Sequence, residues 1–415
     1  MTTDTAVEAV PIITSAGQAV GVGCELATAL ADGAIERDRA SADPDRASAD
    51  PDRISAVPAD ALAALDSSGL LGITVPREYG GADVPATTLA EVIRLIAMAD
   101  PAIAQVPQAH FLFVDVLAAY GTQRQRQRLF GDVLAGGRLG NGQAERGGQH
   151  AQDLQTRLLN GRLTGRKYYC TGALTSRWIG VSALDASDRL VLVFVERDAR
   201  GVHLDEDWNV MGQRATVSGG ARFDNVLVDT SLVLPYHQAF ERPQQLGARS
   251  QLIHAAIQVG IAGGALHDAG EFIRLKARPF FEAVRGGWAP NAAEDPHTIR
   301  HFGLMATRVR AAEALLNDAA AVLDEIGRVP SDSAAAARGS IAVAEAKAFA
   351  SEVAVQVASD LFALSGASAT DERHDLSRHW RNARTHASHD PVAWKYHHVG
   401  NYLLSGVQPP NHAQI

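Results

Sequence analysis

The spacing of apolar residues along the chain divides it into three stretches. Up to about residue 135, apolar positions recur every three or four residues, which is the period of amphipathic helices. Pro58 suits the first turn of one such helix, and Gly69 suits its C-terminal end. The N-terminal stretch is therefore predicted to be helical, with helices at about 16–38, 58–69, 86–98 and 107–119.

The second stretch begins after Gly136-Gly137 and alternates short β-branched or apolar runs with turn residues. RLVLVFVER and ARFDNVLVDTSLVL each have the length of a strand, and Asn160-Gly161 is a strong hairpin signal. From residue 246 onward long apolar repeats return, and the last predicted helix starts at Asp390-Pro391 with Asp390 as its N-cap. The C-terminal helices are predicted at about 247–277, 296–327, 334–365, 375–386 and 390–404.

The order helical, β, helical predicts an α+β fold with a central β-barrel or sandwich between two helical domains. RASADPD occurs at 39–45 and again at 46–52, and its composition predicts a solvated surface loop. The predicted divisions are a disordered tail 1–15, an N-terminal helical domain 16–137 with the repeat loop 39–53, a β-domain 138–242, a four-helix bundle 243–405 and a tail 406–415.

Composition excludes several classes of protein. The net charge of −9 comes from 38 basic and 47 acidic residues dispersed along the chain, which disfavours nucleic-acid binding. The N-terminus lacks the pattern of a signal peptide, and no segment approaches eighteen uninterrupted apolar residues, so no membrane association is expected. Cys24 and Cys170 cannot form a disulfide framework. We expect a cytoplasmic protein.

Glycine motifs point to packing rather than to nucleotide binding. Gly21-Val22-Gly23 lies within a predicted helix and has no strand before it, so a dinucleotide-binding fingerprint fails its structural context. The run VGIAGGALHDAG, at 259–270, is better explained by small residues that let helices approach closely. No P-loop and no zinc-ligand pair with cysteine appears in the sequence.

The run RNARTHASHDPVAWK, at 381–395, carries the densest candidate chemistry. It places His386, His389 and Asp390 within five residues. From the residues alone the cluster could be a metal site, an acid/base site or the polar end of a helix. Two histidines three residues apart share a helix face and titrate near neutral pH. The irregular spacing of the six histidines between 374 and 398 favours a polar face around a pocket over a metal tract.

Four stretches, in order, resemble the acyl-CoA dehydrogenase superfamily over about residues 55–405. They are ITVPREYGGADV at 73–84, KYYCTGA at 167–173, DWNVMGQRATVSGGARFDNVLV at 207–228 and RNAR at 381–384. In the dehydrogenases the position that corresponds to Asp390 is the catalytic glutamate, followed by Gly-Thr; here Pro391-Val392 follows. An aspartate is one methylene shorter, and proton abstraction tolerates little misplacement.

The run RTHxxHDP is similar instead to the flavin-dependent monooxygenase branch of the superfamily, typified by dibenzothiophene monooxygenase and by oxidoreductases of sulfur acquisition. That resemblance implies His389 as an acid or hydrogen-bond donor during oxygen transfer, with His386 supporting flavin or substrate. It also implies that further residues face or bind the flavin. These are His110, Asn141 and Thr171 near the reacting atoms, Trp208 as a packing wall, and Arg278 with Phe280 at the flavin phosphate, reached from a neighbouring chain.

The resemblance leads to three functional hypotheses. The first is a two-component monooxygenase that takes reduced FMN from a separate NAD(P)H:flavin reductase and oxygenates a small organosulfur compound; the chain has no nicotinamide-binding motif of its own. The second is an FAD-dependent acyl-CoA dehydrogenase that oxidises an acyl thioester. The third is a non-catalytic flavin- or ligand-binding relative. A homodimer or homotetramer is implied, and no metal is expected.

Overall fold

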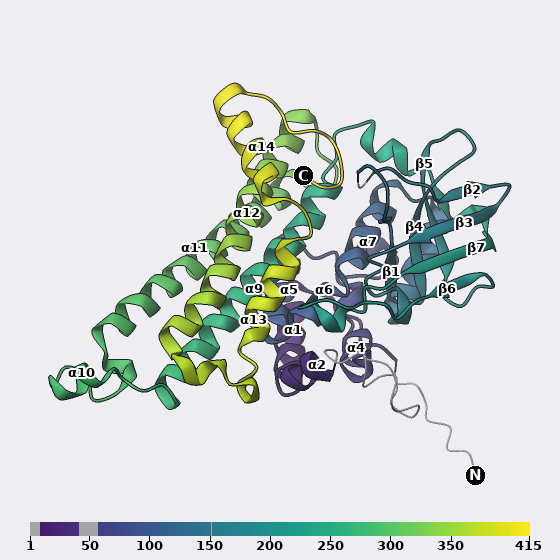
Figure 1. Cartoon of the computed structure of the whole chain (residues 1–415). Helices are drawn as coiled ribbons and strands as arrows, with labels where there is room; N and C mark the ends of the chain where they lie inside the picture. Colours follow the sequence, from purple (N-terminus) through teal and green to yellow (C-terminus); the bar gives the residue numbers. More distant parts are fainter. Residues whose placement is uncertain (1–8, 41–56, 151) are drawn as a thin grey trace, which may run out of the picture.

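The computed structural model describes residues 9–40, 57–150 and 152–415. Most of the predicted repeat loop, residues 41–53, and the first eight residues of the predicted N-terminal tail lie outside these ranges. The described parts form a helical N-terminal region, a β-sheet region and a long C-terminal bundle, in the predicted order (Figure 1).

The N-terminal helices follow the predicted apolar pattern with two differences. The helix expected over 16–38 is broken at Asp32 and Gly33, and a polar helix that the apolar period did not predict follows Thr122. Thr122 and Gln125 form a capping box that begins this helix, and its buried face includes Leu129 and Phe130. The helices are α1 (Ala16–Ala31), α2 (Ala34–Ala40), α4 (Ala59–Ser67), α5 (Ala86–Ala99), α6 (Pro101–Gln105), α7 (Gln108–Tyr120) and α8 (Gln123–Leu134).

The β-region is an eight-stranded sheet with the order β6-β7-β3-β2-β4-β5-β8, and β1 pairs in parallel with β4. Asn160 and Gly161 both have positive φ, at 52° and 71°, and close the predicted hairpin between β2 and β3. The strands are β1 (Leu139–Gly142), β2 (Arg157–Leu159), β3 (Arg162–Lys167), β4 (Trp178–Leu184), β5 (Leu190–Glu196), β6 (Val202–Leu204), β7 (Ala221–Leu227) and β8 (Val233–Leu234).

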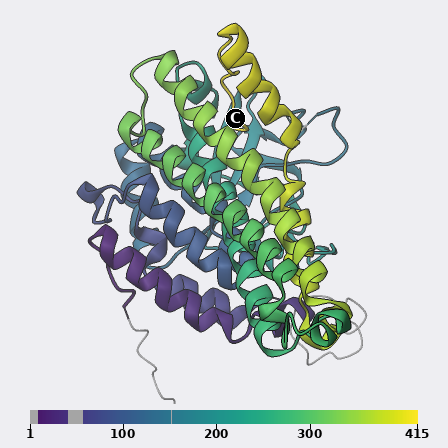
Figure 2. The same cartoon turned by 90° about the vertical axis from the view of Figure 1, so that its left-hand side faces the viewer.

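The C-terminal region consists of long helices packed side by side, with α9 and α12 in extensive contact (Figure 2). Asp295 and Asp332 cap α11 and α12 with their carboxylates. The helices are α9 (Leu246–Leu275), α10 (Phe281–Arg285), α11 (Pro296–Ile326), α12 (Ser333–Ser365), α13 (Ser377–Ala387) and α14 (Val392–Ser405).

Described residues from both predicted tails, 1–15 and 406–415, pack into the molecule. Ile13 is buried in the core shared by the N-terminal helices and the bundle. Ile415 is buried as well, and the carbonyl oxygen of Gln414 accepts a hydrogen bond from Lys395. The last residues of the chain therefore belong to the folded structure.

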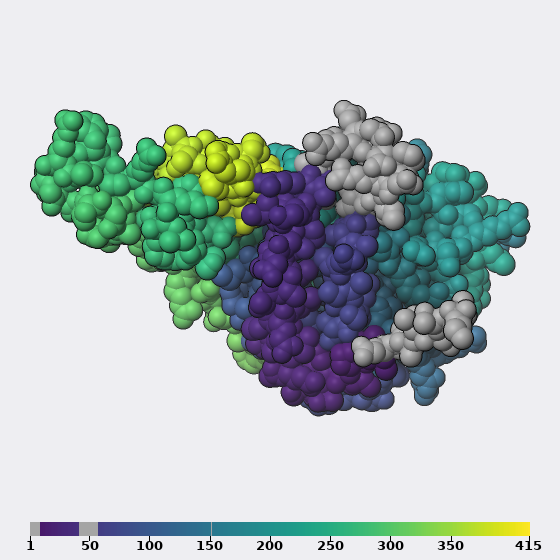
Figure 3. Space-filling view, turned by 90° about the horizontal axis from the view of Figure 1, so that it is seen from below, coloured from purple at the N-terminus to yellow at the C-terminus, as the bar shows by residue number. Residues whose placement is uncertain are grey.

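The N-terminal helices join the other two regions. A first apolar core is formed by α1, α5 and the bundle, and a second by α7, α8 and one face of the sheet. Seen from below, the N-terminal helices lie between the tip of the bundle and the β-region (Figure 3). Within residues 9–40, 57–150 and 152–415, two helical stretches are long and apolar enough to cross a membrane, Pro101–Tyr120 and Ser333–Ser365. Most of the apolar part of each is buried inside the molecule, as in a core helix.

Candidate active site

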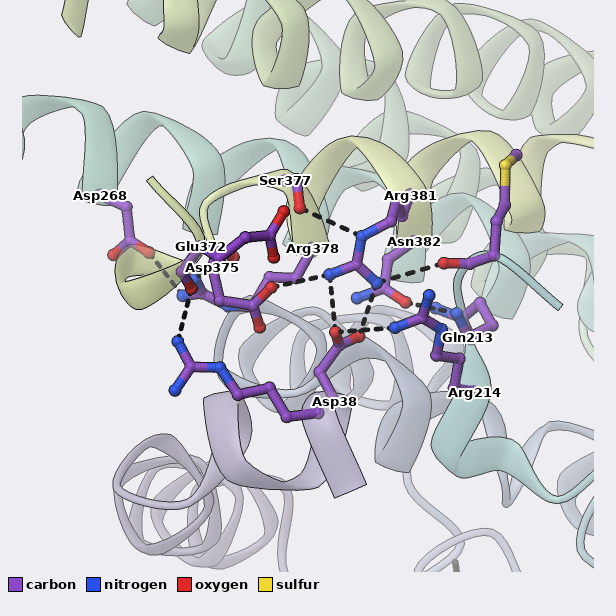
Figure 4. Close-up of polar contacts among 12 residues, drawn as sticks. Asp38, Gln213, Arg214, Asp268, Glu372, Asp375, Ser377, Arg378, Arg381 and Asn382 are labelled. Carbon is purple, nitrogen blue, oxygen red and sulfur yellow. Dashed lines mark hydrogen bonds and ion pairs between the residues drawn. The ribbon is translucent and has the colours of Figure 1, made fainter. Parts of the chain in front are cut away.

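The helix that carries RNAR is anchored by Arg381, which reaches across to the N-terminal region (Figure 4). Its Nη2 lies 2.7 Å from Asp38 Oδ2 and 2.8 Å from Asp375 Oδ1, and Arg214 lies 3.6 Å from the same Asp38 oxygen. The two carboxylates are almost fully buried, so both are compensated by guanidinium groups. This network joins α2, α13 and the loop before β7.

The loop before β7 lies directly against α13. Asn382 Oδ1 accepts a hydrogen bond from the backbone of Gln213, and a Cβ atom at Gly212 would lie 2.1 Å from the carbonyl oxygen of Arg381. Only glycine permits so close an approach of two backbones. Val217 has a φ of 46°, which is unfavourable for a β-branched residue. The loop is therefore held in a strained conformation next to α13.

That loop completes a row of hydroxyl groups in the β-region. Ser218 Oγ lies 2.7 Å from both Thr171 Oγ1 and Thr216 Oγ1. Asn141 lies beside Thr171, since its backbone N–H donates to the Thr171 carbonyl oxygen at 3.0 Å. Trp208 is half-buried and donates from Nε1 to the carbonyl oxygen of Gln213 at 2.9 Å. The structure thus brings together three of the predicted flavin-facing residues.

Three histidine rings meet one turn along α13 from Asn382. His386 Nε2 lies 3.1 Å from Gln105 Oε1 and 3.2 Å from His254 Nδ1, and the rings of His254 and His389 have their centroids 4.1 Å apart. The oxygen of Gln105 can only accept, so His386 carries its proton on Nε2 and has a bare Nδ1. That buried Nδ1 has no hydrogen-bond partner among the described residues.

Asp390 does not cap the last helix, which corrects the sequence-based expectation. Helix α14 begins at Val392 and makes no side-chain cap bond at its start. The carboxylate of Asp390 is instead bonded to Lys347 and lies 2.9 Å from Lys395 Nζ and 3.3 Å from His389 Nδ1. Two ammonium groups take the oxygens that would otherwise have capped the helix.

Burial and charge set the protonation of the cluster. Desolvation lowers the pKa of His254 and of His386 well below the ordinary range, and the neighbouring histidine and lysine groups lower it further. Desolvation also lowers the pKa of His389, although 42% of its side chain is exposed; Asp390 opposes this shift, and the charges of Lys347 and Lys395 add to it. At neutral pH the three rings are therefore uncharged.

Asp390 and Lys347 respond in opposite ways to burial. Burial alone would raise the pKa of Asp390, but the hydrogen bond from His389 and the ammonium groups of Lys347 and Lys395 hold it well below its usual range. Desolvation lowers the pKa of Lys347 to about 8, against the opposing effect of Asp390. Asp390 is thus a permanent anion beside three neutral histidines.

Other predicted site residues lie apart from this cluster. His110 is fully buried; its Nε2 lies 2.9 Å from the Leu71 carbonyl oxygen, and its Nδ1 accepts from Leu139 N–H at 3.2 Å. Both of its ring nitrogens are used to bridge backbone, so its contacts do not support a role facing the flavin. Arg278 and Phe280 lie exposed beside α10, at the tip of the bundle remote from the β-region (Figure 1).

The sequence interpretation missed four members of the cluster. These are Gln105, His254, Lys347 and Lys395. A signal for two of them was present, because His254 and Lys347 are titratable residues within long, mostly apolar helices, where such side chains are seldom buried without a partner. Among the described residues no group of three or more histidine, cysteine or acidic side chains has the geometry of a metal site.

Comparison with known proteins places this arrangement in a family. The chain matches the acyl-CoA dehydrogenase N-terminal domain over residues 31–137 and the acyl-CoA dehydrogenase C-terminal domain over 252–394. Dibenzothiophene monooxygenase from Rhodococcus erythropolis is 32% identical over 373 residues, which cover 83% of this chain and 86% of that protein. The chain belongs to the flavin monooxygenase branch of the acyl-CoA dehydrogenase superfamily.

Two further relatives agree with this placement. A probable FMNH2-dependent monooxygenase, SfnC from Pseudomonas putida, is 30% identical over 413 residues, covering 96% of this chain and 98% of that protein. The crystal structure of FMN-bound TdsC from Paenibacillus sp. A11-2 superposes with a TM-score of 0.87 at 28% identity, covering 96% of this chain and all of that chain. The predicted three-region fold is confirmed.

Proposed function

We propose that this chain is the oxygenase component of a two-component flavin monooxygenase in sulfur acquisition, acting on a small organosulfur compound. Reduced FMN, when bound, would supply two electrons, which with O2 place one oxygen atom on sulfur and release the other as water. The names of the relatives support this reading, since they include dibenzothiophene monooxygenase and an FMNH2-dependent monooxygenase. A separate NAD(P)H:flavin reductase would deliver the FMN.

The ionisation and contacts of Asp390 are the observation that favours an oxygenase over a dehydrogenase. It occupies the position of the dehydrogenase base, and a base of this kind needs a pKa near the working pH. Lys347 and Lys395 hold its pKa well below that range, and its oxygens are already engaged. A carboxylate in this state is too weak a base to remove an α-proton from a thioester, which argues against the alternative of an FAD-dependent acyl-CoA dehydrogenase.

The chain's own residues fit a bound flavin. The bare, buried Nδ1 of His386 can accept from a donor on the ring or substrate. The hydroxyl of Thr171 and the amide of Asn141 offer donors and acceptors on the β-region side, with Trp208 as a wall. His389 would hold and move a proton at Nε2, since its Nδ1 is directed to Asp390.

Arg278 points to a second copy of the chain. It lies just before α10, which is at the tip of the bundle remote from the β-strands, so it could bind the phosphate of a flavin held by another copy but not one held by its own β-region (Figure 1). Its surroundings expose several large apolar side chains, as a subunit interface would: Leu275, Phe280, Phe281, Val284 and Trp288. We therefore include a homodimer or homotetramer in the proposal.

The compartment is also part of the proposal. Cys24 and Cys170 are both free thiols, one exposed and one buried, which suits a reducing environment. We expect the enzyme to work in the cytoplasm, with no nucleic-acid or membrane partner.

The proposal is tested by reconstitution. Purified protein, FMN, a flavin reductase, NADH and oxygen-18 O2 are incubated with sulfides, sulfoxides, sulfones, sulfinates and sulfonates, and products are read by mass spectrometry. We expect one labelled oxygen in the product of at least one class, and its loss by at least about a hundredfold in His389→Ala. His203→Ala, which replaces an exposed histidine on β6, is the matched control.

A parallel experiment tests the alternative that the chain is an FAD-dependent acyl-CoA dehydrogenase. Under anaerobic conditions, protein loaded with FAD is mixed with a series of acyl-CoA thioesters and followed by visible absorbance. We expect the flavin to stay oxidised. Bleaching by an acyl-CoA, together with no labelled product in the oxygenation panel, would overturn the monooxygenase proposal in favour of the dehydrogenase.

A further inference from the structure

A buried ion cluster lies behind the histidines. Lys347, in the middle of α12, and Lys395, near the start of α14, are each only 3% exposed, and Asp390 is 9% exposed. Lys347 is bonded to Asp390 and to the side-chain oxygen of Gln251, and Lys395 is bonded to Asp390 and to the carbonyl oxygen of Gln414. Two ammonium groups thus share one carboxylate.

Positions 347 and 395 carry lysine in a chain whose basic residues are mostly arginine. Only four of the 38 basic residues of the chain are lysines, and two of those four bind Asp390. Arginine is always charged and spreads five donors over a plane, whereas an ammonium group is compact and its charge responds to its surroundings. A buried ion pair contributes little net stability compared with apolar side chains of the same size, so stability alone does not account for this cluster.

The carboxylate of this cluster fixes the His389 ring. An ionised carboxylate can only accept, so at 3.3 Å it orients His389 with its proton on Nδ1 and a free Nε2. Charged and titratable groups from four helices lie around His389: His254 from α9, Lys347 from α12, His386 from α13 and Lys395 from α14. Of the two lysines, Lys347 is bonded to the same Asp390 oxygen, Oδ1, that His389 contacts.

We infer that Lys347 is a positioning residue that acts on His389 through Asp390. Its bond to the shared oxygen keeps Asp390 ionised and in place, which fixes the His389 tautomer. Its positive charge opposes protonation of the His389 ring, so that a proton placed on Nε2 is readily given up. The contribution of Lys347 to oxygen transfer rests on the proposed function. Its effects on the orientation and protonation of His389 do not.

Histidine titration by NMR tests the inference. Protein with isotope-labelled histidine is titrated, and the His389 signal is assigned by its loss in His389→Gln. In the wild type we expect the neutral ring with its proton on Nδ1. We expect the His389 pKa to rise in Lys347→Met, because a nearby positive charge is removed, and to fall in Asp390→Asn, because the carboxylate is lost while both ammonium groups remain.

A matched control separates the change in the His389 pKa from the general effect of losing a buried ion pair. Lys167→Met removes another buried lysine, paired with Glu145 on the β-region, and should leave the His389 titration unchanged. Shifts of the same sign in Lys347→Met and Asp390→Asn, or no shift in either, would overturn the inference. If Lys347→Met does not fold, Lys347→Gln replaces it, and a wild-type ring protonated on Nε2 overturns the inference without any variant.

Kinetics provide the second readout. In the oxygenation assay, Lys347→Met should lower kcat about tenfold and leave KM for the sulfur substrate unchanged. The acidic limb of the kcat–pH profile should move to higher pH, because the His389 pKa rises. A rise in KM with an unmoved pH profile would contradict a positioning role. If no substrate in the panel is oxygenated while the NMR shifts appear as expected, the proposed function fails and the inference about Lys347 stands.

Discussion

His110 is expected to make the protein sensitive to acid. Desolvation, aided by the charge of Arg138, lowers the pKa of this fully buried ring from 6.5 to about 4. Between these two values the unfolded chain binds a proton and the folded chain does not, so stability falls as the pH falls through this window. At 1.36 kcal/mol per pKa unit, the loss attributable to His110 amounts to about 3 kcal/mol by pH 4.

The variant His110→Phe isolates this contribution. At pH 7 it leaves the Leu71 carbonyl and the Leu139 N–H without their partner, which costs about 1–3 kcal/mol for each group. As the pH falls, the wild type loses the His110 contribution and the variant does not. The gap in unfolding free energy between the two proteins should therefore narrow by about 3 kcal/mol between pH 7 and pH 4.

The measurement is urea unfolding followed by tryptophan fluorescence at several pH values between 7 and 4. Other buried histidines also lose stability on acidification, but they are present in both proteins and cancel in the difference. His203→Phe, at an exposed position of β6, controls for replacement of a histidine as such. A gap that stays constant across the whole range would refute the assignment of an acid-sensitive role to His110.

Two further predictions concern the contacts that place the site. Gly212→Ala would place a methyl group 2.1 Å from the backbone oxygen of Arg381, so we expect FMN affinity, measured by fluorescence titration, to fall at least about tenfold. As a control, Gly303→Ala adds a methyl group to α11 at a position with nothing within 4 Å, and it should be neutral or stabilise the fold by about 0.5–1 kcal/mol. Asp115→Asn removes the buried partner of Arg249, 2.7 Å away, and should lower the unfolding free energy by about 3–5 kcal/mol in urea titrations.

Much of the fold could be predicted from local patterns because those patterns report local physics. The period of apolar residues located α9, α11 and α12 to within a few residues, and Asn160-Gly161 marked its hairpin because both residues tolerate positive φ. The polar helix α8 was not predicted because its sequence has little apolar content outside Leu129, Phe130 and Val133. Its start was nonetheless encoded in the capping box at Thr122.

The candidate site was less predictable because it is assembled from helices distant in sequence. His386 and His389 were found since they lie together in one motif, whereas His254 comes from α9 and Gln105 from α6. His110 was expected to face the flavin because of the family resemblance, and the sequence did not indicate that its ring ties Leu71 to Leu139. A linear sequence does not state which polar residues of separate helices will face one another.

Asp390 shows how a sound local rule is overridden by a distant contact. Asp followed by Pro is a good start for a helix, and an N-cap contributes roughly 1 kcal/mol. In the folded chain Lys347 arrives from α12 and Lys395 from α14, and leaving a buried charge without its partner costs about 3–5 kcal/mol. The ion pairs with the two lysines are therefore worth more than the cap, and α14 starts without a side-chain cap. The same competition that removes the cap also removes any dehydrogenase base from this position, because a carboxylate claimed by two ammonium groups cannot also accept a proton from substrate.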